Sequence, residues 1–185
     1  TLKEFIAYAK ENQGKLSFGT AGTGTLTHLA GELFKQLIGA PGITHIPYKG
    51  GAEWMQALLA GQINFLADAS QWGPFVDDGR CRILAMATEQ RLPRYANVPT
   101  LTERGIDIVG QSPYGLVGPK GLPPQAVQAL YDAFHAANND PATLELLARY
   151  IQVPWNRNPT EYRAFAESYY VSVKPLLIKA ELAKG

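Results

Sequence analysis

Residues 16–28 read LSFGTAGTGTLTH, and this stretch decides the class of the fold. The apolar run Leu16–Gly19 predicts a short strand, and Thr20–Thr25 is a loop rich in glycine and threonine. The apolar residues that follow recur at helical spacing, which predicts a helix with the inner face Leu26, Leu29, Ala30, Leu33, Phe34 and Leu37. A strand, a glycine-rich turn and a helix in this order begin a parallel β-α-β unit.

The same alternation extends on both sides of this stretch. A helix that starts at Leu2 is expected to stop at Gly14. Further strands are predicted at Ile43–Pro47, Ile63–Ala67 and Arg82–Ala87, separated by helices at Glu53–Ala60 and Gln71–Asp78. Strands that alternate with helices predict an α/β fold with a parallel-rich sheet.

The pattern changes after Pro99. The segment Gly110–Pro119 is extended and rich in turn residues, which makes it the best candidate for a hinge or crossover. Beyond it we expect one short strand, Ile151–Trp155, and three helices that open at Pro124, Pro141 and Pro159. The tail is therefore expected to be mostly helical, with almost no sheet of its own.

Composition narrows the classes of function. The 185 residues carry 17 Lys and Arg against 16 Asp and Glu, with no basic run, so nucleic acid is not an expected partner. No apolar stretch approaches the ~20 residues that a membrane span needs. The start Thr1–Phe5 matches neither a signal peptide nor an initiator methionine, and we interpret it as a cut end.

No catalytic, metal or cofactor site is predicted. The single cysteine, Cys81, allows no internal disulfide and no cysteine-based metal site. Its neighbours Arg80 and Arg82 favour a thiolate, whereas its place at a strand start favours a small apolar role, which we prefer. The three histidines lack zinc-site spacing, and no Gly-x-Ser-x-Gly nucleophile elbow is present.

The loop Thr20–Thr25 is the segment best suited to hold a ligand. Amides at a helix N-terminus lack partners, glycines let a ligand approach the backbone, and threonine hydroxyls add donors. The loop therefore predicts an anion site without a charged side chain, with a plain capped turn as the alternative. It is not a dinucleotide fingerprint, because Thr27 stands at the third glycine position, and no Gly-Lys-Ser/Thr makes it a phosphate loop. His28 is expected either to touch the ligand or to make an interior hydrogen bond.

Polar or flexible residues directly follow two other predicted strands. Lys49 and Gly50 follow the strand Ile43–Pro47, and Asp68 follows Ile63–Ala67. Ligands of α/β sheets bind beyond the carboxyl ends of the strands. Lys49 is therefore a candidate to attract an anion, with a solvated surface lysine as the alternative.

Taken together, these segments resemble the Bug-type solute receptors of tripartite tricarboxylate transporters. Each motif is weak alone, but their order and spacing cover nearly the whole chain. The resemblance is carried by Gly19–Thr25 with His28, His45–Gly51, Leu59–Ile63, Gly79–Ala85, Arg91, Asn97–Thr100 with Glu103 and Gly105, and Gly118–Pro119 with Pro123.

The resemblance implies a periplasmic binding protein of the two-lobed, Venus-flytrap type. Such a receptor captures a small carboxylate or an amino acid in the periplasm and passes it to membrane transporter subunits. Residues 1–112 would form the second ligand-binding lobe, and residues 113–185 the hinge crossover with the C-terminal helices of the first lobe. No cofactor is implied.

Ligand contacts are carried over from the family position by position. The carboxylate grip is expected from Thr20, Thr23, Gly24 and Thr25. Two further loops are expected to close around the ligand, and their residues are Lys49, Gly50, Asp68, Ala69 and Ser70.

One departure from the family pattern matters. Family proteins begin with roughly a hundred further residues that form most of the first lobe. Without them, two apolar stripes in the tail would lack the sheet that they normally cover, so this chain alone is expected to be empty and to self-associate or to fold its tail onto its own second lobe. The stripes consist of Val127, Leu130, Tyr131 and Phe134, and of Phe165, Tyr169 and Leu176.

Two other functions stay open at this stage. An enzyme on a similar two-lobed fold, such as a lyase or a transferase, would need an acid, base or nucleophile converging on the threonine loop, and Lys49 is the only obvious candidate. The other function is that of a ligand sensor of the same fold.

Overall fold

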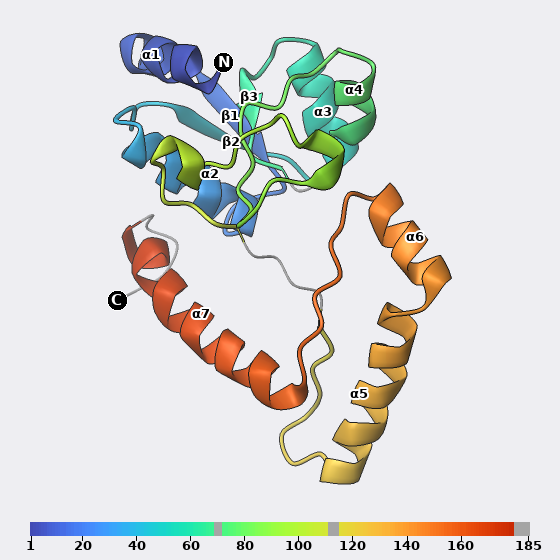
Figure 1. The fold of residues 1–185 in the computed structure, drawn as a ribbon. Coiled ribbons are helices and arrows are strands. Elements are labelled where there is room, and N and C mark those ends of the chain that lie inside the picture. Colours follow the sequence, from blue (N-terminus) through green and yellow to red (C-terminus); the bar gives the residue numbers. More distant parts are fainter. Residues whose placement is uncertain (69–71, 111–114, 180–185) are drawn as a thin grey trace. The chain divides into compact units, whose positions relative to one another are not determined.

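The computed structural model describes residues 1–68, 72–110 and 115–179 of the chain (Figure 1). The chain divides into two compact units. Unit 1 consists of Thr1–Gln111 and Leu176–Gly185, and unit 2 of Ser112–Pro175. The two units are described separately below, and the predicted division into lobes stays a prediction.

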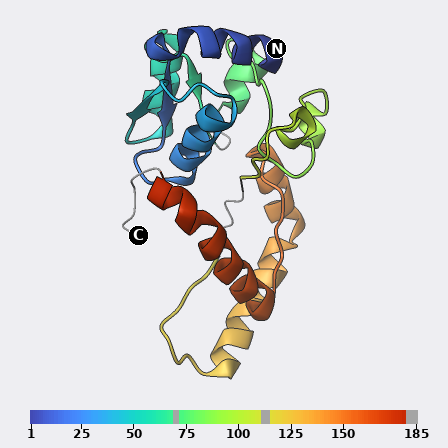
Figure 2. The ribbon, with the colours of Figure 1, turned by 90° about the vertical axis from the view of Figure 1, so that its left-hand side faces the viewer.

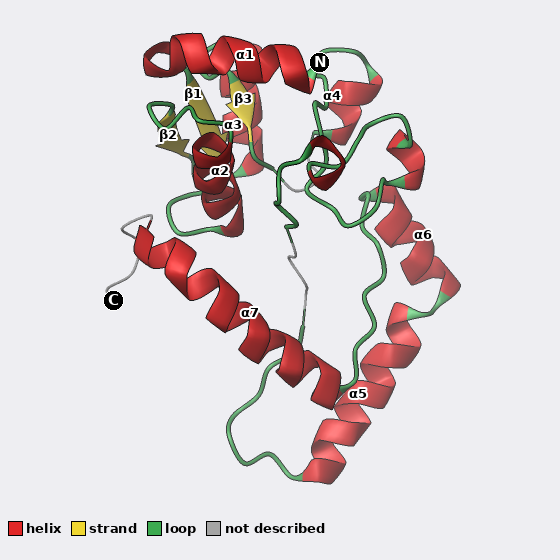
Figure 3. Ribbon diagram, turned by 60° about the vertical axis from the view of Figure 1, so that its left-hand side comes forward, coloured by secondary structure: helices red, strands yellow, loops and turns green. Residues whose placement is uncertain are grey.

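Unit 1 is built on a small parallel sheet. Its strands are β1 (Ser17–Thr20), β2 (Thr44–Pro47) and β3 (Phe65–Leu66), in the order β2-β1-β3. Both neighbours pair with β1 in parallel, with Phe18 opposite His45 on one side and Phe65 on the other. The predicted α/β class and the parallel pairing are confirmed (Figure 3).

Four α-helices accompany the sheet in unit 1, and each agrees with a predicted helix to within a few residues. Helix α1 begins with a capping box, in which Thr1 and Glu4 exchange hydrogen bonds. Phe5 of α1 packs against Phe34 and Phe65, so α1 meets both α2 and β3 (Figure 2). The four helices are α1 (Leu2–Asn12), α2 (Leu26–Leu37), α3 (Gly51–Leu59) and α4 (Gly73–Asp77).

The core of unit 1 is centred on Phe18, which has no exposed surface. Its ring stacks on Phe65 with 5.4 Å between centroids, and its other neighbours include α2 at Gly31. A β-carbon at Gly31 would overlap the Phe18 ring, so only glycine allows α2 to approach the sheet this closely. The buried residues of this cluster are Leu2, Ala9, Leu16, Phe18, Ile38, Ala40, Ile43, Ile106 and Ile108.

The predicted strand Arg82–Ala87 is wrong. Only Met86 is paired there, in one isolated parallel bridge with Thr100. Met86 donates to Pro99 O and accepts from Leu101 N, so this segment is satisfied by a loop rather than by the sheet. Periodicity alone did not identify this partner, because an apolar run fits either environment.

The loop that meets Met86 is closed by an ion pair. Arg91 donates to Glu103 through Nε at 3.0 Å and through Nη2 at 2.8 Å, and through Nη1 to Ala96 O at 3.0 Å. The segment before Gly105 forms a 3-10 turn, Thr102–Arg104, and Gly105 has φ of +77°. Fork-shaped bonding by an arginine fixes geometry as well as charge, and it holds this loop against the core.

Unit 2 contains helices and loops. The helices are α5 (Pro124–Asn138), α6 (Pro141–Arg149) and the first part of α7 (Pro159–Lys179), and each has proline in its first turn as predicted. The predicted strand Ile151–Trp155 is wrong, because the described part of the chain offers it no partner strand and Ile151 has a positive φ of 58°. The helical character of the tail is confirmed.

None of the described residues of unit 2 is buried. Leu130 and Phe134 of the first predicted stripe are 47% and 55% exposed. Phe165 of the second stripe stacks on Tyr169 and meets Trp155 edge to face, and the side chain of Leu176 lies outside the described residues. Two residues of the second stripe therefore stack on each other, whereas Leu130 and Phe134 of the first stripe are exposed, and self-association stays a prediction.

Replacement of Gly31 by alanine tests the packing of α2 on the sheet. Helix propensity alone would favour alanine by about 1 kcal/mol, but the overlap with Phe18 should reverse the sign and lower the free energy of unfolding by about 1–3 kcal/mol. Urea unfolding followed by circular dichroism measures the change. Gly14→Ala is the matched control, because nothing lies within 4 Å of the added carbon and its stability should be unchanged or slightly raised. Equal losses in both variants would contradict the packing.

Candidate functional site

The candidate site lies where the three parallel strands end. Backbone hydrogen bonds hold the loops that follow side by side: Tyr48 N donates to Thr20 O at 3.1 Å, and Ala67 N donates to Gly19 O at 3.3 Å. A β-carbon on Gly22 would lie 3.6 Å from Tyr48 O, so the first two loops are in contact. Asp68 directly follows Ala67 and is partly buried. The structure therefore brings the segments of Thr20, Lys49 and Asp68 to one edge, while Ala69 and Ser70 lie outside the described residues.

The glycine–threonine loop is held by its own side chains. Thr25 caps α2, since its Oγ1 accepts from His28 N at 3.3 Å and donates to Gly22 O at 2.7 Å. Ala21 N donates to Thr27 Oγ1 at 3.3 Å. Gly22 and Gly24 have φ of +127° and +82°, which only glycine adopts without strain. The loop is therefore fixed in shape before any ligand arrives.

Three amides of this loop remain for a ligand. Gly22 N donates to Thr20 Oγ1 and Gly24 N donates to His28 Nδ1, so those two amides are occupied. Within residues 1–68, 72–110 and 115–179, no acceptor is found for the amides of Thr23, Leu26 and Thr27. Free amides at the N-terminus of a helix attract an anion through both hydrogen bonding and the helix dipole.

The four residues predicted to grip a carboxylate occupy different positions. Thr20 has no exposed surface, and its hydroxyl contacts His45 Nε2 at 2.6 Å. Thr25 is occupied as the helix cap, whereas Thr23 and Gly24 are exposed at the tip of the loop. Thr23 is thus best placed for direct contact, and Thr20 and Thr25 shape the loop. Their predicted contacts with ligand stay predictions.

A second helix N-terminus lies at the same edge. Gly50 is the N-cap of α3 and supplies no side chain, while Lys49 N donates to Glu53 Oε2 at 3.1 Å. In the described part of the chain, the amides of Gly51 and Ala52 have no acceptor. Lys49 and Gly50 are both exposed, and their predicted contact with an anion stays a prediction.

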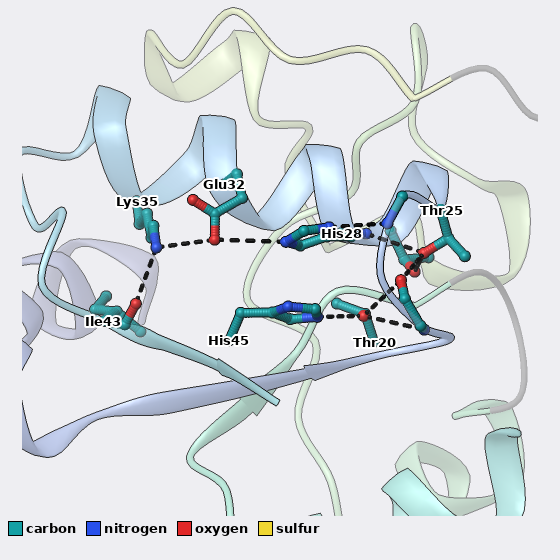
Figure 4. Close-up of polar contacts among 10 residues, drawn as sticks. Thr20, Thr25, His28, Glu32, Lys35, Ile43 and His45 are labelled. Carbon is teal, nitrogen blue, oxygen red and sulfur yellow. Dashed lines mark hydrogen bonds and ion pairs between the residues drawn. The ribbon is translucent and has the colours of Figure 1, made fainter. Parts of the chain in front are cut away.

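Behind the loop lies a polar cluster that sequence reasoning did not assemble (Figure 4). The rings of His28 and His45 stack with 3.8 Å between centroids and 17° between planes. Glu32 Oε1 lies 3.7 Å from His28 Nε2 and 2.8 Å from Lys35 Nζ, and Lys35 donates to Ile43 O at 3.0 Å. His28 is 5% exposed, so of its two predicted roles the interior hydrogen bond is the one observed. The spacing of His28, Glu32 and Lys35 on one helix face was the available signal.

Burial keeps this imidazole pair neutral. It lowers the pKa of His45 to about 4, and the neighbouring His28 and Lys35 act in the same direction while Glu32 opposes them. Burial also lowers the pKa of His28, with Glu32 again opposing. Two imidazolium ions in stacking contact would repel each other without full solvation, so the neutral form is the stable one.

Other candidate chemistry is not assembled in the described residues. Burial raises the pKa of the Cys81 thiol, and its Sγ lies 3.9 Å from Met55 Sδ, in agreement with a small apolar role. The described part of the chain holds no group of three or more potential metal ligands. Nor does it hold a helix long and apolar enough to cross a bilayer.

Comparison with known proteins gives one consistent family. The family model described as "Tripartite tricarboxylate transporter family receptor" matches residues 1–182. The "UPF0065 protein in gbd 5'region" of Cupriavidus necator is 44% identical over 185 residues, which are all of this chain and 56% of that protein. The chain therefore spans little more than half the length of this relative.

Solved structures agree with the sequence comparison. A protein described as a periplasmic transporter has a TM-score of 0.85 and 32% identity, over 97% of this chain and 60% of its own. The protein Rpa4515 of R. palustris, solved with adipate, has a TM-score of 0.81 and 25% identity, over 99% of this chain and 62% of its own. The periplasmic-binding-protein fold predicted from the resemblance is confirmed.

The stacked imidazoles of His28 and His45 predict how the free energy of unfolding depends on pH. Because the folded chain holds His45 at a pKa of about 4, below the ~6.5 of a free histidine, the unfolded chain binds more protons between these values. The free energy of unfolding should therefore be fully developed above about pH 6.5 and fall as the pH drops toward 4. Urea unfolding of the wild type and of His45→Gln measures this, and the variant should show a shallower fall.

The control for this experiment is the range from pH 7 to 8. Neither buried imidazole gains a proton there, so the difference in stability between wild type and variant should stay constant. A wild type and a His45→Gln variant with the same slope between pH 6.5 and 4 would contradict a lowered pKa of His45 in the folded chain.

Proposed function

The chain belongs to the tripartite tricarboxylate transporter receptor family, and from this premise we propose that it binds a small carboxylate for uptake across a membrane. Its family and fold are those of a solute-binding receptor. We propose a binding role without catalysis, in which the ligand leaves the site chemically unchanged. The protein would act in the periplasm and pass its ligand to membrane-embedded transporter subunits.

The observation that carries this proposal is the pair of open helix N-termini at the carboxyl edge of the sheet. The amides of Thr23, Leu26 and Thr27 begin α2, and those of Gly51 and Ala52 begin α3. A carboxylate accepts several such hydrogen bonds at once, and both helix dipoles favour its charge. No charged side chain is needed for this grip, so the site would bind the carboxylate group itself rather than one particular ligand.

The ligand class follows from the same chemistry. The related R. palustris protein was solved with adipate, a linear dicarboxylate, and it matches 99% of this chain in fold. We therefore propose a small di- or tricarboxylate as the main class, with an acidic amino acid as the narrower alternative. The choice between them would depend on Asp68, which repels a second carboxylate and attracts an ammonium group.

This chain spans 56% of its curated relative and about 60% of the solved structures that it matches. We propose that the remaining part of the fold closes over the loops at Thr23 and Gly50 and supplies further hydrogen bonds. Three or four such bonds correspond to roughly two to three decades of affinity, so tight binding would require both parts.

The exposed hydroxyl of Thr23 gives the first test. Thr23→Val keeps the shape of the side chain but removes the hydroxyl, and it should weaken adipate about fivefold, the value of one net hydrogen bond. Isothermal titration calorimetry with adipate, on the protein that carries both parts of the fold, measures the affinity. Thr23→Ser is the matched control and should bind within about twofold of wild type. Equal binding by all three proteins would remove Thr23 from the site.

Asp68 separates the two ligand classes. Asp68→Asn removes a negative charge at the edge of the site, so it should weaken glutamate and leave adipate unchanged or tighter. Competition between the two ligands, measured by calorimetry on wild type and variant, gives the ratio of affinities. An unchanged ratio would show that Asp68 does not contact the ligand, whereas the carboxylate grip at α2 would be untouched by that result.

A further inference from the structure

His28 and His45 connect the core of unit 1 to the glycine–threonine loop, Thr20–Thr25. His45 lies between two rings, with Phe18 at 5.0 Å and His28 at 3.8 Å between centroids. Phe18 and His45 are opposite each other in the sheet, whereas His28 is on the first turns of α2. The stack therefore runs from a fully buried core residue to the residue that contacts the loop.

His28 fixes the tip of the loop through a defined tautomer. Gly24 N donates to His28 Nδ1 at 3.1 Å, so Nδ1 carries a lone pair and the proton of a neutral ring is on Nε2. Glu32 Oε1 lies 3.7 Å from Nε2, on the side where it favours that proton. Glu32 is itself held by Lys35, which is anchored on Ile43 O. A series of contacts from Ile43 through Lys35 and Glu32 thus orients the Nδ1 acceptor of His28 toward Gly24.

His45 fixes the other end of the same loop. Its Nε2 lies 2.6 Å from Thr20 Oγ1, and the same oxygen accepts from Gly22 N at 3.3 Å. Thr20 is fully buried, so its hydroxyl has no contact with solvent. The amides of Gly22 and Gly24 both donate to side chains behind the loop. The amides that remain for a ligand are therefore those of Thr23, Leu26 and Thr27.

We propose that His28 and His45 are positioning residues, which hold the glycine–threonine loop in the form that presents the amides of Thr23, Leu26 and Thr27 to a carboxylate. This inference rests on the proposed function for its ligand, but the shape of the loop is a property of the free protein. The two histidines do not touch the ligand in this scheme. They select which backbone amides are available to it.

The inference requires a neutral His28. A proton on Nδ1 would place a donor against the Gly24 N–H, and the loop would lose its anchor. The charged and titratable groups around the pair are Glu32 and Lys35 on α2, besides the two rings themselves. Since burial lowers the pKa of both rings, the neutral form of the pair, and with it the shape of the loop, is favoured at neutral pH.

The first experiment is nuclear magnetic resonance of the free, nitrogen-15-labelled wild-type protein. We expect His28 as the Nε2–H tautomer and a through-hydrogen-bond coupling between Gly24 N and His28 Nδ1 at neutral pH. A protonated Nδ1 on His28, or no coupling to Gly24, would overturn the proposal. This readout needs no ligand and no variant, so it stands even if adipate proves to be the wrong carboxylate.

The second experiment uses two variants of His28, which separate the stacking ring from the hydrogen-bond acceptor. His28→Phe keeps a stacking ring but has no acceptor, whereas His28→Asn has no ring but places Oδ1 near the position of Nδ1. We expect His28→Phe to weaken adipate about fivefold or more, and His28→Asn to recover most of the affinity, because one hydrogen bond to Gly24 is restored.

The result of this second experiment has clear alternatives. Wild-type affinity in His28→Phe would overturn the positioning role, and so would equal losses in both variants with unchanged unfolding midpoints. Adipate binding by neither wild type nor variants would count against the proposed ligand class, while the Gly24 amide would still report the shape of the loop. A Gly24 resonance shifted in His28→Phe and restored in His28→Asn would then support the positioning role alone.

Discussion

The packing of Phe18 against Gly31 is the contact on which the rest of unit 1 depends. Phe18 is in the central strand, is fully buried, and touches the helix, the neighbouring strand β3 and the ring of His45. Because Gly31 has no β-carbon, α2 lies close to the sheet, and its first turn is brought to the carboxyl edge. The direction of that first turn then decides where the unpartnered amides point.

From this contact a continuous chain of packing leads to the ligand loop. Phe18 supports His45, His45 stacks on His28, and the two rings hold the loop at Thr20 and Gly24. Thr20 and His28 are buried, His45 is partly buried, and each has a polar contact, which is the condition under which a network stiffens a structure rather than weakening it. Rigidity at the site is therefore inherited from the core, and it does not require a ligand.

Much of the fold could be predicted from the sequence, because the helices of unit 1 carry local signals. The helical spacing of apolar residues from Leu26 to Leu37 predicted α2 correctly. The pairing partners of extended segments were harder to predict. Arg82–Ala87 has the composition of a strand, but Met86 pairs with Thr100, which no local pattern indicates. The glycine–threonine loop was located from its residues. The contact of Glu32 with His28 had a local signal in its spacing of four residues, whereas the role of His45 had none, because it depends on a contact across 25 positions whose geometry only the fold supplies.

A grip made of main-chain dipoles has an evolutionary consequence. Every residue type other than proline carries the same amide, so under the proposed function most substitutions at the exposed Thr23 or the partly buried Gly51 would leave the recognition of a carboxyl group in place. Side chains around the rim are then free to vary, and each variation changes which molecule behind the carboxyl group is preferred. Descendants of one such protein can exchange ligands without passing through a form that binds nothing. Only Gly22 and Gly24, which allow the conformation of the loop, and the buried Thr20 and His28, which fix it, are expected to resist substitution.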